Sequence, residues 1–353
     1  MTAQLSHILY ERTPGWLRAV AFARDGRPWH LFQQAWSGEG EAVRAGQIVE
    51  ARVRARADGG GGVFLDHIGW KRLEGGFEAL FCDRKHAEGL HEGMTLQVRV
   101  LSAARRDHAA KITPVESGEA FSDPSMGFHD WMERLGVQRV EEVQGVQTEI
   151  IQAAFDESLT HTVPLVSGGV LHIERTRAMT AFDVDAAGRE GRGSAGAKAL
   201  ALNKVAVAEA ARQMCLRGLG GVMAVDCVEP LNEGARSIVR DACVDAFTVH
   251  DPRTAKVLKP SAFGILEAAI AWQDTPIDEV FSRSETGLLL ELCLAQRALR
   301  ADTGGFYTLG LGEAVYEAYL KRKGIADAEI SAHFQGRLKL GRADGRQEGL
   351  RRQ

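Results

Sequence analysis

The sequence lacks several features that would place a protein in a class at once. It has no run of about 18 apolar residues, which argues against a membrane-spanning helix. Its five cysteines form no C-x-x-C pair, and its first residues lack the positive flank and apolar core of an export signal. We therefore expect reduced cysteines and a cytoplasmic location. The formal net charge of -4 also argues against a chain that is basic throughout, so a nucleic acid would have to meet a local basic patch.

What is present indicates a globular protein of several modules. The chain has 353 residues, of which 45 % are hydrophobic and 25 % are charged. Apolar alternation around a PG and a DG turn predicts a β meander over residues 7–33. Short alternating segments between about 46 and 113 predict a small barrel or a sandwich. Residues 114–160 start with Pro, Ser and Gly and continue with helical spacing, which predicts a linker and a small helical element.

The middle of the chain predicts an α/β unit. The segment MTAFDVD at 179–185 is typical of a strand, and residues 196–217 have the apolar spacing of a long helix that Gly218 and Gly220 would end. VMAVD at 222–226 predicts a short buried strand. Strands and helices that alternate in this way favour an α/β fold.

A second helix is expected after this strand, and more helix toward the end of the chain. Asn232 can cap a helix on which the following five residues would share the buried face: Ile238, Val239, Ala242, Cys243 and Ala246. After Gln273 we expect a helical region that ends in the basic tail GRLKLGRADGRQEGLRR.

Three carboxylates are expected to meet at one edge of the sheet. If 179–185 is a strand, period two places Asp183 and Asp185 on the same face, and Asp226 ends the next strand. Open α/β sheets bind ligands at the carboxyl ends of their strands, and a few oxygen ligands without His or Cys suit Mg²⁺. The alternative is that these acids are solvated residues at the ends of strands.

The segments around these acids closely resemble the catalytic part of the ribonuclease E/G family of bacterial endoribonucleases. They are GGVLHIERTRAMTAFDVDAAG, LNKVAVAEAARQMCLRGLGGVMAVDCVE and SAFGILE, in the family's order. HILYERTPGWLRAVAF also resembles the first hairpin of the family. The resemblance implies an α/β fold with an inserted all-β OB-type barrel, in which a ribonuclease H-like part precedes an α/β catalytic domain.

The resemblance implies a division into five parts. These are an N-terminal β meander of the ribonuclease H-like domain (1–38), an OB-type RNA-binding barrel (39–115), a linker and helical element that completes the ribonuclease H-like part (116–165), an α/β catalytic domain (166–273), and a C-terminal α+β region with the basic tail (274–353).

The resemblance also implies an activity and its residues. Asp183 and Asp226 match the aspartates that bind Mg²⁺ in the family, and Asp185 matches a supporting Asn or Asp. The family's reaction is the hydrolysis of a phosphodiester bond in single-stranded RNA, which leaves a five-prime phosphate. Asn203, on the helix between the acids, also matches an Asn of the family, although it is equally well explained as an ordinary polar helix position.

The barrel would bind the RNA strand with aromatic and basic residues. Phe64 matches the stacking phenylalanine of the family. A second phenylalanine is usual where this chain has Leu80, and Phe81 follows one residue later, on the opposite face of the strand. Arg105, Arg106 and Lys111 form the basic stretch that closes the barrel.

The sequence departs from the family at positions that concern assembly and activity. The C-P-x-C segment that links protomers through zinc is missing, so a zinc-linked tetramer is not expected, although a homodimer remains possible. Ala262 replaces an arginine, and AIAWQD around Trp272 replaces a usual Arg-Gln-Arg.

These losses keep a second hypothesis open, in which the chain is an RNA-binding relative with weak or lost cleavage. A third hypothesis, an unrelated α/β enzyme that uses GREGRGSAGA as a phosphate loop, is weaker because this segment lacks the lysine and the spacing of a P-loop.

Overall fold

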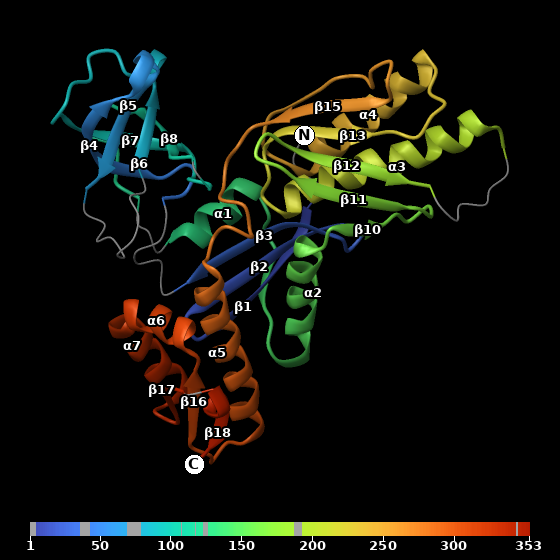
Figure 1. The fold of residues 1–353 in the computed structure, drawn as a ribbon. Helices are drawn as coiled ribbons and strands as arrows, with labels where there is room; N and C mark the ends of the chain where they lie inside the picture. Colours follow the sequence, from blue (N-terminus) through green and yellow to red (C-terminus); the bar gives the residue numbers. More distant parts are fainter. Residues whose placement is uncertain are drawn as a thin grey trace.

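The computed structural model describes residues 5–35, 43–68, 79–106, 108–116, 118–122, 126–186, 193–343 and 345–353. In these residues the chain forms a small barrel, an N-terminal sheet with two helices, an α/β unit and a C-terminal α+β region (Figure 1). In Figure 1 the barrel lies on the left and the α/β unit on the right, and a loop of the barrel contacts the segment that follows the α/β sheet. The expected boundary at residues 38 and 39 and the first half of the GREGRGSAGA segment lie outside the described residues.

The N-terminal sheet is the predicted meander with a fourth strand added. Its order is β3-β2-β1-β9. Apolar residues on both faces of β2 are buried, because α1 packs on one face and α2 on the other. The assignment of this part to a ribonuclease H-like domain stays a prediction. The elements are β1 (Leu5–Thr13), β2 (Trp16–Ala23), β3 (Pro28–Ala35), α1 (Gly127–Leu135), β9 (Val140–Glu142) and α2 (Thr148–Leu159).

The predicted small barrel is confirmed as a closed five-stranded barrel with the order β4-β5-β6-β8-β7. Alternate residues of its strands, such as Val53, Leu65, Leu80 and Ile112, fill the interior. Its OB type stays a prediction. The strands are β4 (Ile48–Arg56), β5 (Gly62–His67), β6 (Ala79–Asp83), β7 (Thr95–Ser102) and β8 (Ala110–Pro114).

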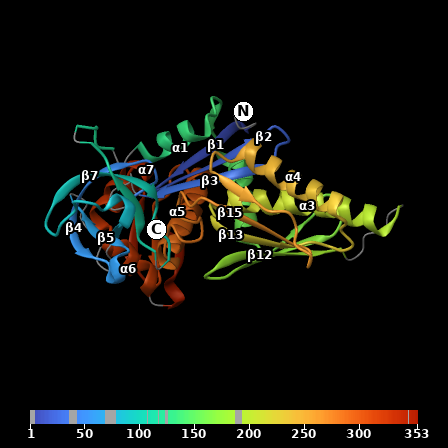
Figure 2. The ribbon, with the colours of Figure 1, turned by 90° about the horizontal axis from the view of Figure 1, so that it is seen from above.

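The α/β unit is a six-stranded sheet with the order β10-β11-β12-β13-β15-β14, in which β12 and β13 run parallel. Both of its long helices lie on the same side of the sheet, and α3 lies between this sheet and the N-terminal sheet (Figure 2). The elements are β10 (Thr162–Pro164), β11 (Val170–Arg175), β12 (Met179–Asp185), α3 (Ala195–Leu216), β13 (Gly221–Asp226), α4 (Glu233–His250), β14 (Ala255–Val257) and β15 (Ile265–Ile270).

Local signals in the sequence explain why these elements begin and end where they do. The Asn232 side chain accepts a hydrogen bond from the Ala235 backbone at 2.8 Å, which confirms the predicted cap of α4. Gly218 adopts a left-handed φ of 67° directly after α3 ends, as expected of a stop glycine.

The expected buried face of α4 was partly wrong. Ile238 is 44 % exposed, and the buried residues recur every fourth position instead: Ala235, Val239, Cys243 and Phe247. Ile238 precedes Val239 by one residue, which turns its side chain about 100° around the helix and away from the sheet.

The C-terminal region is helical only in part, so the expectation of helix up to a basic tail was incomplete. The tail contributes β17 and β18, which flank β16 in a sheet of order β17-β16-β18. Its apolar residues Leu338, Leu340 and Leu350 pack against the core that α5 covers. The elements are α5 (Arg283–Ala301), β16 (Tyr307–Leu311), α6 (Glu313–Lys321), α7 (Lys323–Phe334), β17 (Leu338–Arg342) and β18 (Gly349–Arg352). Among the helices of the described ranges, none has the length and apolar content needed to cross a bilayer.

Candidate active site

The open face of the six-stranded sheet carries the predicted aspartates. Along β12 the residues Thr180, Phe182 and Val184 are buried, because they face the side that the helices cover. The alternate positions therefore point outward, and Asp183 and Asp185 are both exposed. This confirms the strand and the shared face that the sequence predicts.

Asp226 lies beside Asp183. Strand β13 runs parallel to β12, and the register pairs Asp183 with Asp226. Neighbouring strands are about 4.8 Å apart, and paired residues point to the same face. Met223 and Val225 are buried, so Asp226 is on the exposed face. The structure therefore brings these two carboxylates together at the carboxyl ends of two adjacent parallel strands.

Further polar groups surround this pair of aspartates on the open face. On the other side of Asp183, the antiparallel strand β11 pairs His172 with it. On β15, Ile265 pairs with Asp226, and Glu267 pairs with Ala224 two positions before it. The neighbourhood of the two aspartates is therefore acidic and open to solvent.

Asn203 positions the chain just after Asp226. This residue of α3 is fully buried, its side-chain amide donates to the Val228 carbonyl at 2.8 Å, and its side-chain oxygen accepts from the Val228 backbone at 2.9 Å. Both polar groups of the side chain are thus engaged by one residue, two positions beyond Asp226. The Asn203 side chain therefore holds the backbone just beyond Asp226. The sequence alone did not distinguish this role from that of an ordinary polar helix position.

The donor set fits Mg²⁺, which prefers carboxylate oxygens and keeps several waters. Asp183 and Asp226 supply two carboxylates on an open face, where water and a phosphate oxygen could complete the coordination. Asp185 lies two residues further along β12, at the end of the strand.

The three aspartates are less tightly grouped than another set of side chains. Within the residues that the structure describes, a group of three with ligand atoms within 4.8 Å occurs at His129, Asp130 and Glu133 on α1. These side chains belong to one helical turn, and exposed acidic groups of this kind are common without a metal.

The predicted RNA-binding residues of the barrel fall into two sets. In the first set, Phe64 of β5 and Phe81 of β6 are paired in register, and their ring centroids are 5.1 Å apart. Lys111 of β8 pairs with Phe81 on the other side, and the Arg54 guanidinium is 6.0 Å from the Phe64 ring. Both phenylalanines are half-buried and Lys111 is exposed. These four residues form a row across the outside of the barrel, which we call the aromatic row.

The structure also explains the displaced phenylalanine. Leu80 is fully buried and faces Leu65 inside the barrel. Phe81, one residue later, points outward as expected, and this direction places it next to Phe64. The one-residue offset therefore keeps two aromatic rings together.

The second set, Arg105 and Arg106, lies at the contact between the barrel and the α/β unit. The Arg105 guanidinium is 4.1 Å from the centre of the Trp272 ring. Arg106 donates from its backbone N–H and its Nε to Glu279, at 2.7 and 3.0 Å. Both arginines thus contact residues that follow β15, and their part in RNA binding stays a prediction.

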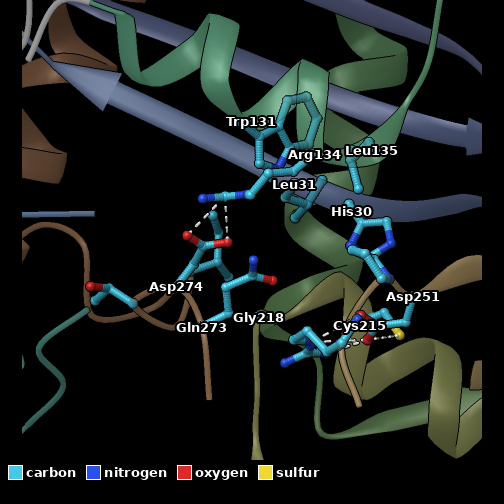
Figure 3. Close-up of a pocket in the computed structure, with 14 residues that line it drawn as sticks. His30, Leu31, Trp131, Arg134, Leu135, Cys215, Gly218, Asp251, Gln273 and Asp274 are labelled. Carbon is cyan, nitrogen blue, oxygen red and sulfur yellow. Dashed lines mark hydrogen bonds and ion pairs between the residues drawn. The ribbon is translucent and has the colours of Figure 1, made fainter. Parts of the chain in front are cut away.

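A separate cavity of about 40 Å³ contains polar groups that sequence reasoning missed (Figure 3). Arg253 forms an ion pair of 2.6 Å with the buried Asp251, and the Cys215 thiol donates to the same carboxylate at 3.0 Å. Arg134 of α1 makes two hydrogen bonds of 3.0 Å to Asp274. The space is about that of one water molecule, so we interpret this group of residues as a polar contact between the N-terminal sheet and the α/β unit.

The charge of Asp251 depends on its neighbours. Burial opposes ionisation of this carboxyl, but the charge of Arg253 and its hydrogen bonds outweigh burial and lower the pKa of Asp251 to about 2. Burial also raises the pKa of the Cys215 thiol well above its usual value. No sequence signal marked this network, because its members are distant in the chain; Cys215 and Asp251 are 36 residues apart.

The part of the chain that carries the aspartates matches known proteins. Residues 70–270 match the model of the ribonuclease E/G family. A ribonuclease E/G-like chloroplastic protein of Arabidopsis thaliana is 33 % identical over 119 residues, which is 33 % of this chain and 12 % of that protein. Ribonuclease G of Escherichia coli K12 is 32 % identical over 132 residues, 37 % of this chain and 26 % of that protein.

A third relative gives a similar alignment. Ribonuclease E of Haemophilus influenzae is 32 % identical over 117 residues, 33 % of this chain and 12 % of that protein. The chain therefore spans a small part of the length of these relatives. The family match covers more than half of the chain, including the strands and helices that carry the aspartates. On this evidence the chain belongs to the ribonuclease E/G family.

Proposed function

We propose that this chain is a Mg²⁺-dependent endoribonuclease that hydrolyses phosphodiester bonds of single-stranded RNA. The observation that carries the proposal is the register pairing of Asp183 with Asp226 on the open face of the sheet. Two carboxylates on parallel strands have no structural need to be adjacent, since their charges repel each other unless a cation or a proton relieves the repulsion.

The roles of the residues follow from their positions. A bound Mg²⁺ would activate water and stabilise the charge that develops on the phosphate. Asp183 and Asp226 would hold the ion, and Asp185 would support the site from the end of β12. Asn203 fixes the backbone beyond Asp226. The aromatic row of the barrel would bind the RNA strand by stacking, with Lys111 placed for phosphate contact. A cytoplasmic location, and no zinc-linked tetramer, are expected for such an enzyme.

A second candidate is an RNA-binding relative with weak or lost cleavage. The observation that favours it is the exposed Ala262 at the position of a family arginine, together with Trp272, whose ring packs against Gly220, Gly221 and Arg105. The cations usual in these segments are absent, so the negative charge of the phosphate would be neutralised less at this edge.

The test is cleavage of a labelled single-stranded RNA with and without Mg²⁺. We expect Asp183→Asn and Asp226→Asn each to reduce cleavage to background while RNA binding persists, because each change removes a ligand charge but little volume. The double variant should lose little more than either single one, because ligands of one ion act as a unit. Asp185→Asn should have a milder effect.

The matched control is Asp245→Asn, which neutralises an exposed aspartate on α4, on the other side of the sheet. Cleavage that survives Asp183→Asn, or that is unchanged by a chelator, would remove the metal-site proposal. RNA binding without cleavage by the unmodified chain in Mg²⁺ would favour the second candidate.

A further inference from the structure

A pocket of about 300 Å³ lies where the barrel meets the amino ends of β12 and β13. The loop between β7 and β8 and the turn between β11 and β12 supply its cationic side chains. Its charged and ionisable lining consists of Arg105, Arg106, His108, Arg175 and Arg177. Among the described residues, no acidic side chain lines it; Asp107 lies outside them. The pocket is therefore strongly cationic in a chain whose net charge is negative.

Two of the four arginines are engaged by acids behind the pocket. Arg106 donates to Glu279, and Arg175 donates to Asp278 at 3.0 Å and also to Glu279. These contacts fix both guanidinium groups at the wall of the pocket. The two carboxylates balance two of the four positive charges.

Arg105 is held in place but is incompletely satisfied. Its guanidinium stacks on Trp272, and the Trp272 ring is itself fixed against the backbone, since a Cβ on Gly220 would lie 2.9 Å from it. The Nη1 of Arg105 is buried and has no hydrogen-bond partner within the described ranges. A buried charged donor without an acceptor is unfavourable, so an acceptor from a ligand would improve its environment.

Arg177 also lines the pocket. Its side chain is exposed, and it forms no ion pair with the residues that the structure describes. It follows Arg175 and Thr176 in the turn that leads into β12. Arg105 and Arg177 thus present to the same space two guanidinium groups that form no ion pair among the described residues.

We propose that this pocket binds a phosphate group through Arg105 and Arg177. A guanidinium presents a planar fork of donors that matches phosphate oxygens. The phosphate could belong to an RNA strand or to a free nucleotide, and the RNA case rests on the proposed function. Met179, which lines the pocket, precedes Asp183 by four strand residues, or about 13 Å. A phosphate bound here is therefore not the one placed at the aspartates.

The experiment measures binding of inorganic phosphate to the full chain by calorimetry, without any cleavage. We expect Arg177→Gln and Arg105→Gln each to weaken phosphate binding at least about tenfold, since each removes a charged hydrogen-bond donor. Arg84→Gln is the control, because it removes an equal charge from an exposed position on the barrel and should change the affinity by less than about twofold. Arg177 is exposed, so its variant should fold even if Arg105→Gln loosens the contact between barrel and sheet.

Two further binding measurements identify the source of the phosphate. If RNA occupies the pocket, phosphate competes with a short single-stranded RNA, and Arg177→Gln weakens RNA binding. If a nucleotide occupies it, adenosine monophosphate binds more tightly than phosphate, and RNA affinity is the same in Arg177→Gln. Equal phosphate affinity in all variants, or no binding by the unmodified chain at millimolar phosphate, overturns the proposal. Asp183→Asn should bind phosphate normally, so loss of the cleavage proposal would leave this result unaffected.

Discussion

Asp251 shows how one buried residue links pH to stability. Its pKa is about 2 in the folded chain, below the usual 3.8, so its ionised form is stabilised by folding. A shift of nearly two units corresponds to about 2 kcal/mol. Because the folded pKa is lowered, this contribution is complete above about pH 5 and is lost as the pH falls through about 2.

We predict that Asp251→Asn lowers the free energy of unfolding by about 2 kcal/mol or more at pH 7, because it leaves the buried Arg253 without a counter-charge. The difference from the unmodified chain should shrink by about 1 kcal/mol at pH 3, where part of the contribution has been lost. Urea unfolding at both pH values measures this difference in the free energy of unfolding. Asp245→Asn, at an exposed position, is the control. An equal difference at pH 3 and pH 7 would contradict this origin of the stability.

At the scale of elements, the pairing of β5 with β6 creates a surface that neither strand has alone. Phe64 and Phe81 come from strands whose connection includes residues 69–78, yet the register places their rings in contact. Adding β8 brings Lys111 into the same row. A stacking surface with a cation at its end is therefore a property of three strands.

We predict that Phe64→Ala and Phe81→Ala each weaken binding of a short single-stranded RNA by about 1–3 kcal/mol, the usual worth of one base stacked on an aromatic ring. Fluorescence anisotropy at low salt measures the affinity. Phe306→Ala removes an equally large exposed ring from the C-terminal region and should have no effect. If Phe81→Ala binds as well as the unmodified chain, the second ring has no part in binding.

Local signals account for the elements that could be predicted. A strand-like segment predicted β12, a short apolar run predicted β13, and Asn232 and Gly218 marked limits of the two long helices. Local periodicity did not locate the strands of the C-terminal region, which the resemblance gave only as α+β, because these strands are four or five residues long and pair with distant segments. Such strands are specified by pairing with distant segments, which local periodicity does not reveal.

The candidate site could also be predicted only in part from local signals. Period two along one strand placed Asp183 and Asp185 together, and the α/β alternation placed Asp226 beside them. The direction of Arg105, by contrast, depends on how the barrel docks on the α/β unit. The Ala103 backbone donates to the Gln273 carbonyl at 2.7 Å, and the Thr275 hydroxyl donates to the Ala104 carbonyl at 2.8 Å. Contacts between modules of this kind have no signature in either segment.

At the scale of the whole molecule, the charge is arranged for local binding. The net charge is -4, but the aromatic row includes Arg54 and Lys111, and Arg105 and Arg177 line the proposed phosphate pocket. A chain of this composition should repel RNA over most of its surface and attract it at these places. Binding should therefore depend on a small number of phosphate contacts.

This arrangement predicts a moderate salt dependence of RNA binding. Each phosphate contact to a single strand contributes a slope of about -0.7 to the plot of log affinity against log salt, so four contacts give about -3. Lys111→Gln should reduce the steepness by about 0.7, because it removes one contact from the aromatic row. Arg177→Gln should reduce the steepness by the same amount only if the RNA strand reaches the phosphate pocket. Arg240→Gln, on α4 and paired with Asp241, is the control that should leave the slope unchanged. A slope near zero in the unmodified chain would mean that phosphate contacts contribute little and that stacking on Phe64 and Phe81 alone holds the RNA.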